Sequence, residues 1–216
     1  MKIKQIEILS NDLIETEEFY AGKLGLNIKD KTDLKISFIV GESVLIFLKT
    51  DIKKPVYHFA FNIPNNQLAE AEQWLLQRTS IIQYENKNVI DFQNWNAKSL
   101  YFLDNNGNVL EFIVRFDLEN SSPKTFRSSG ILSISEMALV TNDVEELATK
   151  LINENKFSYF DKQIQGKNFS VLGEDEGLLI LVDSERNWFP TDIRSEKFPV
   201  KLLIDANNNL TELEYK

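Results

Sequence analysis

The sequence predicts an α+β protein built from repeated βαβββ modules, each with one strand, one helix and three further strands. Two observations lead to this prediction. An apolar strand, an Asn-Asp pair and an amphipathic helix follow one another at residues 5–19 and again at residues 136–150. In each case the helix is followed by pairs of strands that glycine-containing turns join, which is the pattern of β-hairpins.

The amino-acid composition indicates which classes of protein the chain can belong to. The chain has 216 residues, 43% of them hydrophobic and 26% charged, as is typical of a globular protein with a core of its own. Its 33 acidic and 24 basic residues give a net charge of -9, which argues against binding to nucleic acid or to anionic membranes. No apolar run approaches the roughly 20 residues of a membrane span, and the N-terminus leads directly into an alternating strand. Because the chain has no cysteine, disulfides and thiolate chemistry are excluded, and we expect a cytoplasmic location.

Module one spans residues 1–50. Its helix begins after the Asn-Asp pair at 11–12, since short polar side chains accept hydrogen bonds from the free amides of a first helical turn. Acidic residues crowd that turn, as the helix dipole favours. Two strands follow at residues 34–40 and 43–48, with a Gly-Glu turn between them.

Module two spans residues 55–116 and begins with the strand that starts at Tyr57. We expect its helix at about residues 67–77. Its last two strands are expected at 99–103 and 108–115, because the Asp-Asn-Asn-Gly sequence between them favours a tight hairpin.

Module three spans about residues 131–192, with expected strands at 168–172 and 178–183. A fourth module begins at about residue 197, and the sequence ends inside it. We therefore expect the third module to lack a full partner within the chain, so that a second subunit, in a homodimer, or the C-terminal stub covers its open sheet edge.

A domain boundary is expected at residues 117–130. This segment is rich in Ser, Asn and Pro, which is the composition of a linker. The prediction is an N-terminal domain at residues 1–116 that carries the functional site. Residues 131–216, with the third module and the truncated fourth, are expected to carry no ligand set.

The first strands of the three modules place one polar residue at the same position. It stands seven residues before the Asp or Asn that precedes each helix, and the three are Gln5, His58 and Glu136. His58 is the only histidine of the chain, so any chemistry that needs an imidazole depends on it.

Glu111 is the unusual residue on the last strands. It stands where the other two modules have Ile46 and Ile180. A charge on the inner face of a strand is costly unless it is paired or binds a cation. His58 and Glu111 together therefore suggest a metal site, although a lone histidine on a strand is more often structural.

Three motifs within the first 116 residues carry a family resemblance. They are Gln5…Asp12…Phe19-Tyr20…Leu24-Gly25-Leu26, then His58-Phe59-Ala60-Phe61, and then Tyr101-Phe102-Leu103-Asp104-Asn105-Asn106-Gly107-Asn108-Val109-Leu110-Glu111-Phe112. In these motifs the chain resembles the vicinal oxygen chelate superfamily, the group of glyoxalase I, extradiol dioxygenases and fosfomycin- and bleomycin-resistance proteins. The resemblance covers residues 1–116 well and 131–216 weakly. It implies the glyoxalase/dioxygenase-like fold, in which βαβββ modules pair into curved mixed sheets around a hollow.

The resemblance also implies a ligand set. By position, Gln5, His58 and Glu111 correspond to the family's metal ligands, and the fourth position is Ile46, which cannot bind a metal. An amide, an imidazole and a carboxylate suit one divalent ion such as Mn²⁺, Fe²⁺, Co²⁺, Ni²⁺ or Zn²⁺. The ion would act as a Lewis acid, and Glu111 is the expected catalytic residue. Two other carboxylates are weaker candidates: Glu7 shares the strand face of Gln5, and Glu136 is interpreted as a partly exposed strand residue.

A substrate pocket is expected beside the metal. Its candidate residues are Trp95, Asn96, Tyr101, Phe47 and Arg115. Most of the aromatic residues on these strands are expected in the core, and Arg115 either binds a substrate carboxylate or forms a surface ion pair. The segment 186–191, Arg-Asn-Trp-Phe-Pro-Thr, is interpreted as a structured loop without an assigned role.

These features favour a metal-dependent enzyme, a lyase or an oxidoreductase, that acts on a small oxygen-chelating molecule. A conventional ring-cleaving dioxygenase uses more than one histidine, which this chain does not have. The main alternative is a metal-free, bleomycin-resistance-like protein that binds a small apolar or aromatic ligand. A structural scaffold is a third reading. The sequence identifies neither the substrate nor the metal.

Overall fold

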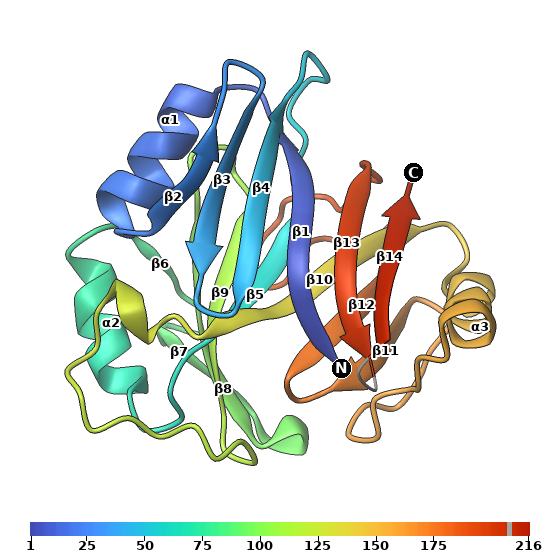
Figure 1. The fold of residues 1–216 in the computed structure, drawn as a ribbon. Coiled ribbons are helices and arrows are strands. Elements are labelled where there is room, and N and C mark those ends of the chain that lie inside the picture. Colours follow the sequence, from blue (N-terminus) through green and yellow to red (C-terminus); the bar gives the residue numbers. More distant parts are fainter. Residues whose placement is uncertain (207–208) are drawn as a thin grey trace.

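In the computed structural model, which describes residues 1–206 and 209–216, the strands form two sheet halves that meet where β1 (Lys2–Ser10) crosses β10 (Ser133–Thr141). The junction is the pairing of Ile3 with Ile134. The first half lies at the front of Figure 1. Its strands are, in order, β2 (Asn27–Lys31), β3 (Lys35–Val40), β4 (Ser43–Lys49), β1, β13 (Val200–Ala206) and β14 (Asn209–Tyr215).

The second half contains β10 and lies behind the first (Figure 1). Its strands are β6 (Ile81–Ile82) and β7 (Val89–Phe92), both paired with β8 (Ala97–Leu103), then β9 (Val109–Arg115), β5 (His58–Asn62), β10, β12 (Gly177–Asp183) and β11 (Phe169–Glu174).

The helices lie at the edges of the sheets (Figure 1). They are α1 (Leu13–Glu17), continued by the π-helical turn η1 (Glu18–Lys23), α2 (Leu68–Leu76) and α3 (Val144–Asn155), with short 3₁₀ turns η2 (Gln93–Trp95) and η3 (Ser128–Gly130). Within the described residues, every helix is too short or too polar to cross a membrane. The Asn-Asp signals act as expected: Asp12 accepts hydrogen bonds from two amides of α1, and Asp143 accepts one from α3.

The predicted modules are present, and in each the first strand runs parallel to the last. These pairs are β1 with β4, β5 with β9, and β10 with β12. The pairing between modules differs from the expectation, because β5 of module two pairs with β10 of module three, while β1 pairs with β13. The sequence repeat specifies each module but not its neighbour, since the hydrogen bonds between strand edges are made by backbone groups common to all residues.

This pairing removes the reason given for a dimer. The third module has a partner in the chain, which is module two, and the C-terminal stub forms a hairpin beside module one. Two residues of that stub, 207 and 208, lie outside the described part of the chain. Residues 117–130 thus connect β9 of module two to β10 of module three, two strands of the same second sheet half.

The main core lies between the two sheet halves. Ile6 and Ile8 of β1 and Phe59 and Phe61 of β5 are buried in it. Because successive side chains of a strand point to opposite faces, His58 and Ala60 of β5 face away from this core. His58 therefore lies on the outer face of the second sheet half.

Gly41 makes the contact between the β3–β4 turn and the start of module three. Its φ is +52°, and a Cβ at this position would overlap the backbone carbonyl of Leu132, which accepts a hydrogen bond from the Glu42 amide. We expect Gly41→Ala to destabilise the protein by at least about 2 kcal/mol, because backbone strain and a backbone clash combine. Chemical denaturation checks this, with Gly22→Ala as the control, since Gly22 has open space around it. Equal stability of the two variants would contradict the expectation.

Candidate metal site and pocket

Two carboxylates face each other across a small residue on three neighbouring strands. Glu111 on β9 and Glu136 on β10 each lie directly opposite Ala60 on β5. A register shift between Ile134 and Glu136 sets this alignment. Because the Ala60 side chain is a single methyl group, the two longer side chains can approach each other across it, and their ligand atoms lie within 4.8 Å of one another.

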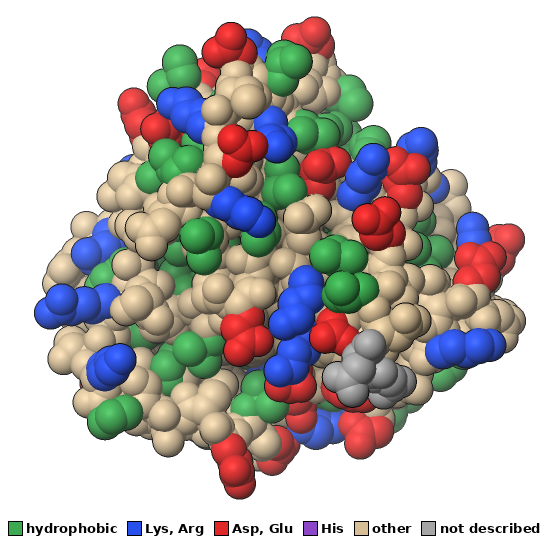
Figure 2. Space-filling view, in the orientation of Figure 1, with side chains coloured by type: hydrophobic (Ala, Val, Ile, Leu, Met, Phe, Trp, Pro, Cys, Tyr) green, Lys and Arg blue, Asp and Glu red, His purple; other side chains and the backbone are tan. Residues whose placement is uncertain are grey.

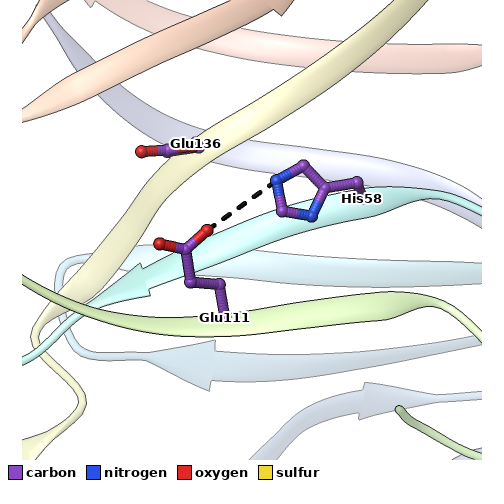
Figure 3. A group of neighbouring side chains, drawn as sticks. All are labelled: His58, Glu111 and Glu136. Carbon is purple, nitrogen blue, oxygen red and sulfur yellow. Dashed lines mark ion pairs between the residues drawn. The ribbon is translucent and has the colours of Figure 1, made fainter. Parts of the chain in front are cut away.

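His58 completes the group. It lies two residues before Ala60 on β5, so its side chain is on the same face of the sheet. His58, Glu111 and Glu136 each offer one ligand atom, and these atoms lie within 4.8 Å of one another. The His58 Nε2 is 3.8 Å from a Glu111 carboxylate oxygen, and Figure 3 shows the two side chains pointing toward each other from adjacent strands. All three side chains are buried.

A backbone hydrogen bond sets the tautomer of His58. Its Nδ1 lies 2.9 Å from the carbonyl oxygen of Val109, a group that can only accept, so Nδ1 carries the proton. Nε2 is then free to bind a metal ion from inside the group. Burial lowers the pKa of His58, and the nearby charge of Glu136 opposes this only in part. The imidazole is therefore neutral, as a metal ligand must be.

Glu111 is held by a hydroxyl group of the next strand. The Ser99 hydroxyl donates to one carboxylate oxygen, and Tyr101, on the same strand, lies directly opposite Glu111. Burial raises the pKa of Glu111, while the hydrogen bond from Ser99 and the charge of Arg115 act in the opposite direction. The second carboxylate oxygen is the one that faces His58.

Glu136 is held by Arg115, whose side chain is completely buried. The guanidinium donates to one oxygen of Glu136 and lies 3.6 Å from Asp175, which pairs in turn with Lys162 at 2.5 Å. Burial, together with the charge of Glu111, raises the pKa of Glu136 to about 7. Two adjacent buried carboxylates with one guanidinium leave an excess of negative charge, which a cation would neutralise.

A pocket of about 530 Å³ opens above the three residues. Its walls are largely aromatic and include Phe92, Trp95, Tyr101, Phe169, Trp188 and Phe189. The Trp188 ring lies 5.8 Å from the His58 ring, and Phe189 packs edge-on to Tyr101 at 5.9 Å between ring centres. The segment after β12, which had no assigned role, thus forms a wall of the pocket.

Some of the residues expected at the site from the sequence lie elsewhere. Gln5 is paired with Val44 and Leu203 in the first sheet half, and it does not line the pocket. Phe47 is in the main core, where it packs against Tyr20 at 4.9 Å. Both belong to module one, whose outer face is separate from that of modules two and three.

Two further pocket candidates from module two need correction. Asn96 follows η2 and donates to the exposed carboxylate of Asp117 instead of lining the pocket. Arg115 lies beneath the site, where its charge is used by Glu136 and not by a ligand in the pocket. Trp95 and Tyr101 do line the pocket.

The sequence interpretation missed Glu136. Residues 131–216 are expected from the sequence to carry no ligand set, and the structure places Glu136 of this segment beside His58 and Glu111. The signal was present, since Glu136 occupies the same position in its module as His58 does. The sequence alone favours a partly exposed strand residue at this position, because it does not show which module pairs with module three.

Comparisons with known proteins were made by sequence and by structure. No protein-family model and no curated protein matches the sequence. The fold is similar to that of a proposed dioxygenase from Bacillus subtilis, with a TM-score of 0.57, 18% identity, and coverage of 84% of this chain and 63% of that one. The present chain thus spans less than two thirds of the length of that protein.

Smaller structures match about half of this chain. A glyoxalase/bleomycin resistance protein/dioxygenase from Alicyclobacillus acidocaldarius has a TM-score of 0.44 and 18% identity, covering 54% of this chain and 92% of its own. A lactoylglutathione lyase from Agrobacterium tumefaciens has a TM-score of 0.42 and 20% identity, covering 52% and 92%.

Proposed function

We propose that this chain, which has the paired βαβββ fold of the vicinal oxygen chelate proteins, is a divalent-metal-dependent enzyme that acts on a small oxygen-chelating organic molecule. One observation carries the proposal. His58, Glu111 and Glu136 converge from three adjacent strands at the floor of an aromatic pocket, with the two glutamates on either side of Ala60.

The three donors fit a first-row divalent ion. One neutral imidazole and two carboxylates are the ligands that Mn²⁺, Fe²⁺, Co²⁺, Ni²⁺ and Zn²⁺ accept in proteins. Three protein ligands leave coordination positions for water and a chelating substrate. A second hydrogen bond orients each of the three side chains: His58 donates to the Val109 carbonyl, Glu111 accepts from Ser99 and Glu136 accepts from Arg115. Ligands of metal sites are oriented in this way, which supports the same interpretation.

The bound ion would polarise substrate oxygens as a Lewis acid. The residues of the protein would bind and orient the substrate, and they would move protons. Glu111 is the candidate base, because its pKa is raised and Ser99 and Tyr101 supply hydroxyl groups through which a proton can be passed. The aromatic walls would exclude water and pack against a flat apolar part of the substrate.

Charge gives a further indication of the substrate. A divalent cation, two carboxylates and Arg115 add up to one positive charge in a buried region. A singly negative oxygen ligand would neutralise it. Whether the reaction is that of a lyase or of an oxidoreductase depends on the substrate, and either class is compatible with this arrangement.

Metal uptake is expected to depend on pH. Glu136 must lose its proton to bind a cation, and its pKa of about 7 means that protons compete below this pH. The affinity for Mn²⁺ should therefore fall up to tenfold per pH unit below pH 7 and level off above it. Titration calorimetry in buffers of different ionisation enthalpy checks this, with about one proton released at pH 6 and few at pH 8.5. An affinity that is constant between pH 6 and 8 would contradict the assignment of Glu136.

The direct test is the metal content of the purified protein. After incubation with Mn²⁺, Fe²⁺, Ni²⁺ or Zn²⁺ and removal of free metal, we expect about one equivalent in the parent and little in Glu136→Gln and Glu111→Gln. Gln5→Ala is the matched control and should bind as the parent does, since Gln5 lies in the other sheet half. Loss of metal in Gln5→Ala would favour the ligand set expected from the sequence instead.

Negligible metal under every condition would favour the alternative function, a metal-free protein that binds a small ligand. One observation fits that alternative: Arg115 already provides Glu136 with a positive partner. The aromatic pocket would then be the functional feature, and an apolar ligand should bind equally well in the presence of a chelator.

A further inference from the structure

A second hollow, of about 730 Å³, lies between the end of η1, the end of α2 and residues 126–128. We call it the basic groove, because Lys23, Arg78 and Arg127 line it and none of its described lining residues is Asp or Glu. The chain as a whole has nine more acidic than basic residues, so the positive charge of the groove is opposite in sign to the net charge of the protein. The left edge of Figure 2, beside the ends of α1 and α2, shows basic side chains without acidic ones between them.

One side of the basic groove is held by stacked side chains. The Arg78 guanidinium lies 4.0 Å from the centre of the Trp74 ring and donates to the Trp74 carbonyl oxygen at 2.7 Å. Trp74 packs edge-on against Phe126 at 5.5 Å, which brings Arg127, the next residue, to the same hollow. Arg78 is thus held in place before any ligand binds.

The other side is formed by the loop after η1. Ser128 reaches this loop, because its side chain lies 3.4 Å from the position of a Cβ at Gly25, whose φ is +66°. Lys23 ends η1, with its ammonium group 5.7 Å from the Phe19 ring. Within the described part of the chain, no carboxylate forms an ion pair with Lys23, Arg78 or Arg127.

The preference of cations for the C-terminal ends of helices explains only part of the positive charge in the basic groove. Lys23 is the last residue of η1 and Arg78 lies just beyond the end of α2, and a cation is favourable at the C-terminal end of a helix. Arg127 follows no helix, and it adds a third positive charge to the same hollow. Bringing like charges together on a protein surface is unfavourable, so an unpaired set of three suggests an anionic ligand.

We propose that the basic groove binds the phosphate group of a small phosphorylated molecule. A phosphate monoester carries nearly two negative charges, which three cations match better than they match a single carboxylate. The planar guanidinium groups of Arg78 and Arg127 suit two phosphate oxygens at once, and the Ser128 hydroxyl offers a further donor. The volume of the hollow leaves room for an organic part. This site is separate from the metal site and does not depend on the function proposed for it.

Tryptophan fluorescence tests the proposal, with inorganic phosphate and glucose 6-phosphate as probes and chloride at equal ionic strength as the blank. We expect a saturable change in the parent that Trp74→Phe removes. Arg78→Gln and Arg127→Gln should each weaken binding about tenfold or more. The matched control is Arg194→Gln, an equal loss of charge at an arginine outside the basic groove, which should bind as the parent does.

Two results would overturn the proposal. One is the absence of a saturable response to either phosphate at tens of millimolar. The other is an equal weakening in Arg194→Gln, which would show a general effect of net charge. Arg127 is exposed and lies outside α2, so its variant keeps the test valid even if Arg78→Gln loosens the end of that helix.

Discussion

Replacing Arg115 by methionine is expected to lower the free energy of unfolding of the metal-free protein by about 3–5 kcal/mol. The Arg115 side chain is fully buried, and it is the cationic partner of Glu136 and a close neighbour of Asp175. Methionine fills similar space but leaves the Glu136 carboxylate buried without a positive partner. Urea denaturation in the presence of a chelator measures the difference.

A double variant separates loss of charge from loss of packing. In Arg115→Met with Glu136→Gln, the carboxylate that loses its ion-pair partner is itself removed, so most of the lost stability should return. If the double variant is as unstable as the single one, the packing of Arg115 against Trp95, 5.5 Å away, accounts for the effect instead of the ion pair.

The second large effect is expected at Ala60, which binds nothing itself. Replacing it by leucine places an isobutyl group between Glu111 and Glu136, where the cation would sit. We expect the affinity for Mn²⁺ to fall by more than about 100-fold. Substitution of a residue that only supports a metal ligand typically lowers the affinity by about 10- to 100-fold. Equilibrium dialysis with metal analysis gives the affinity.

The control for this change is Ala60→Ser, which is small enough to leave the site open and should bind within a few-fold of the parent. Circular dichroism and the unfolding midpoint establish that Ala60→Leu is folded. Unchanged metal binding by a folded Ala60→Leu variant would mean that the ion binds elsewhere and would overturn the proposed site.

The sequence predicts the local structure well, because local structure depends on local signals. Asp12 and Asp143 begin their helices as expected, and the Gly41 turn joins its two strands. His58 and Glu111 could also be assigned to one site, since parallel pairing of β5 with β9 follows from the module itself.

The third member of the site could not be predicted in this way. Choosing Glu136 over Gln5 requires knowing that β5 pairs with β10 and not with β1, and strand edges contain no residue code for that choice. The same holds for Arg115, which the sequence places either in the substrate pocket or in a surface ion pair. Its burial follows from Glu136 and Asp175, which come from segments 20 and more residues away.

The seam between β5 and β10 links the site to the register of the sheet. Glu136 faces His58 only because of the irregularity at residue 135, and a slip of one residue would turn its side chain to the core face. Occupancy of the site and correct registration of these strands are therefore one equilibrium. A cation at 100 times its dissociation constant would favour the registered state by about 2.7 kcal/mol. A bound ion would thus stabilise the correct register of β5 and β10 in addition to its part in the chemistry.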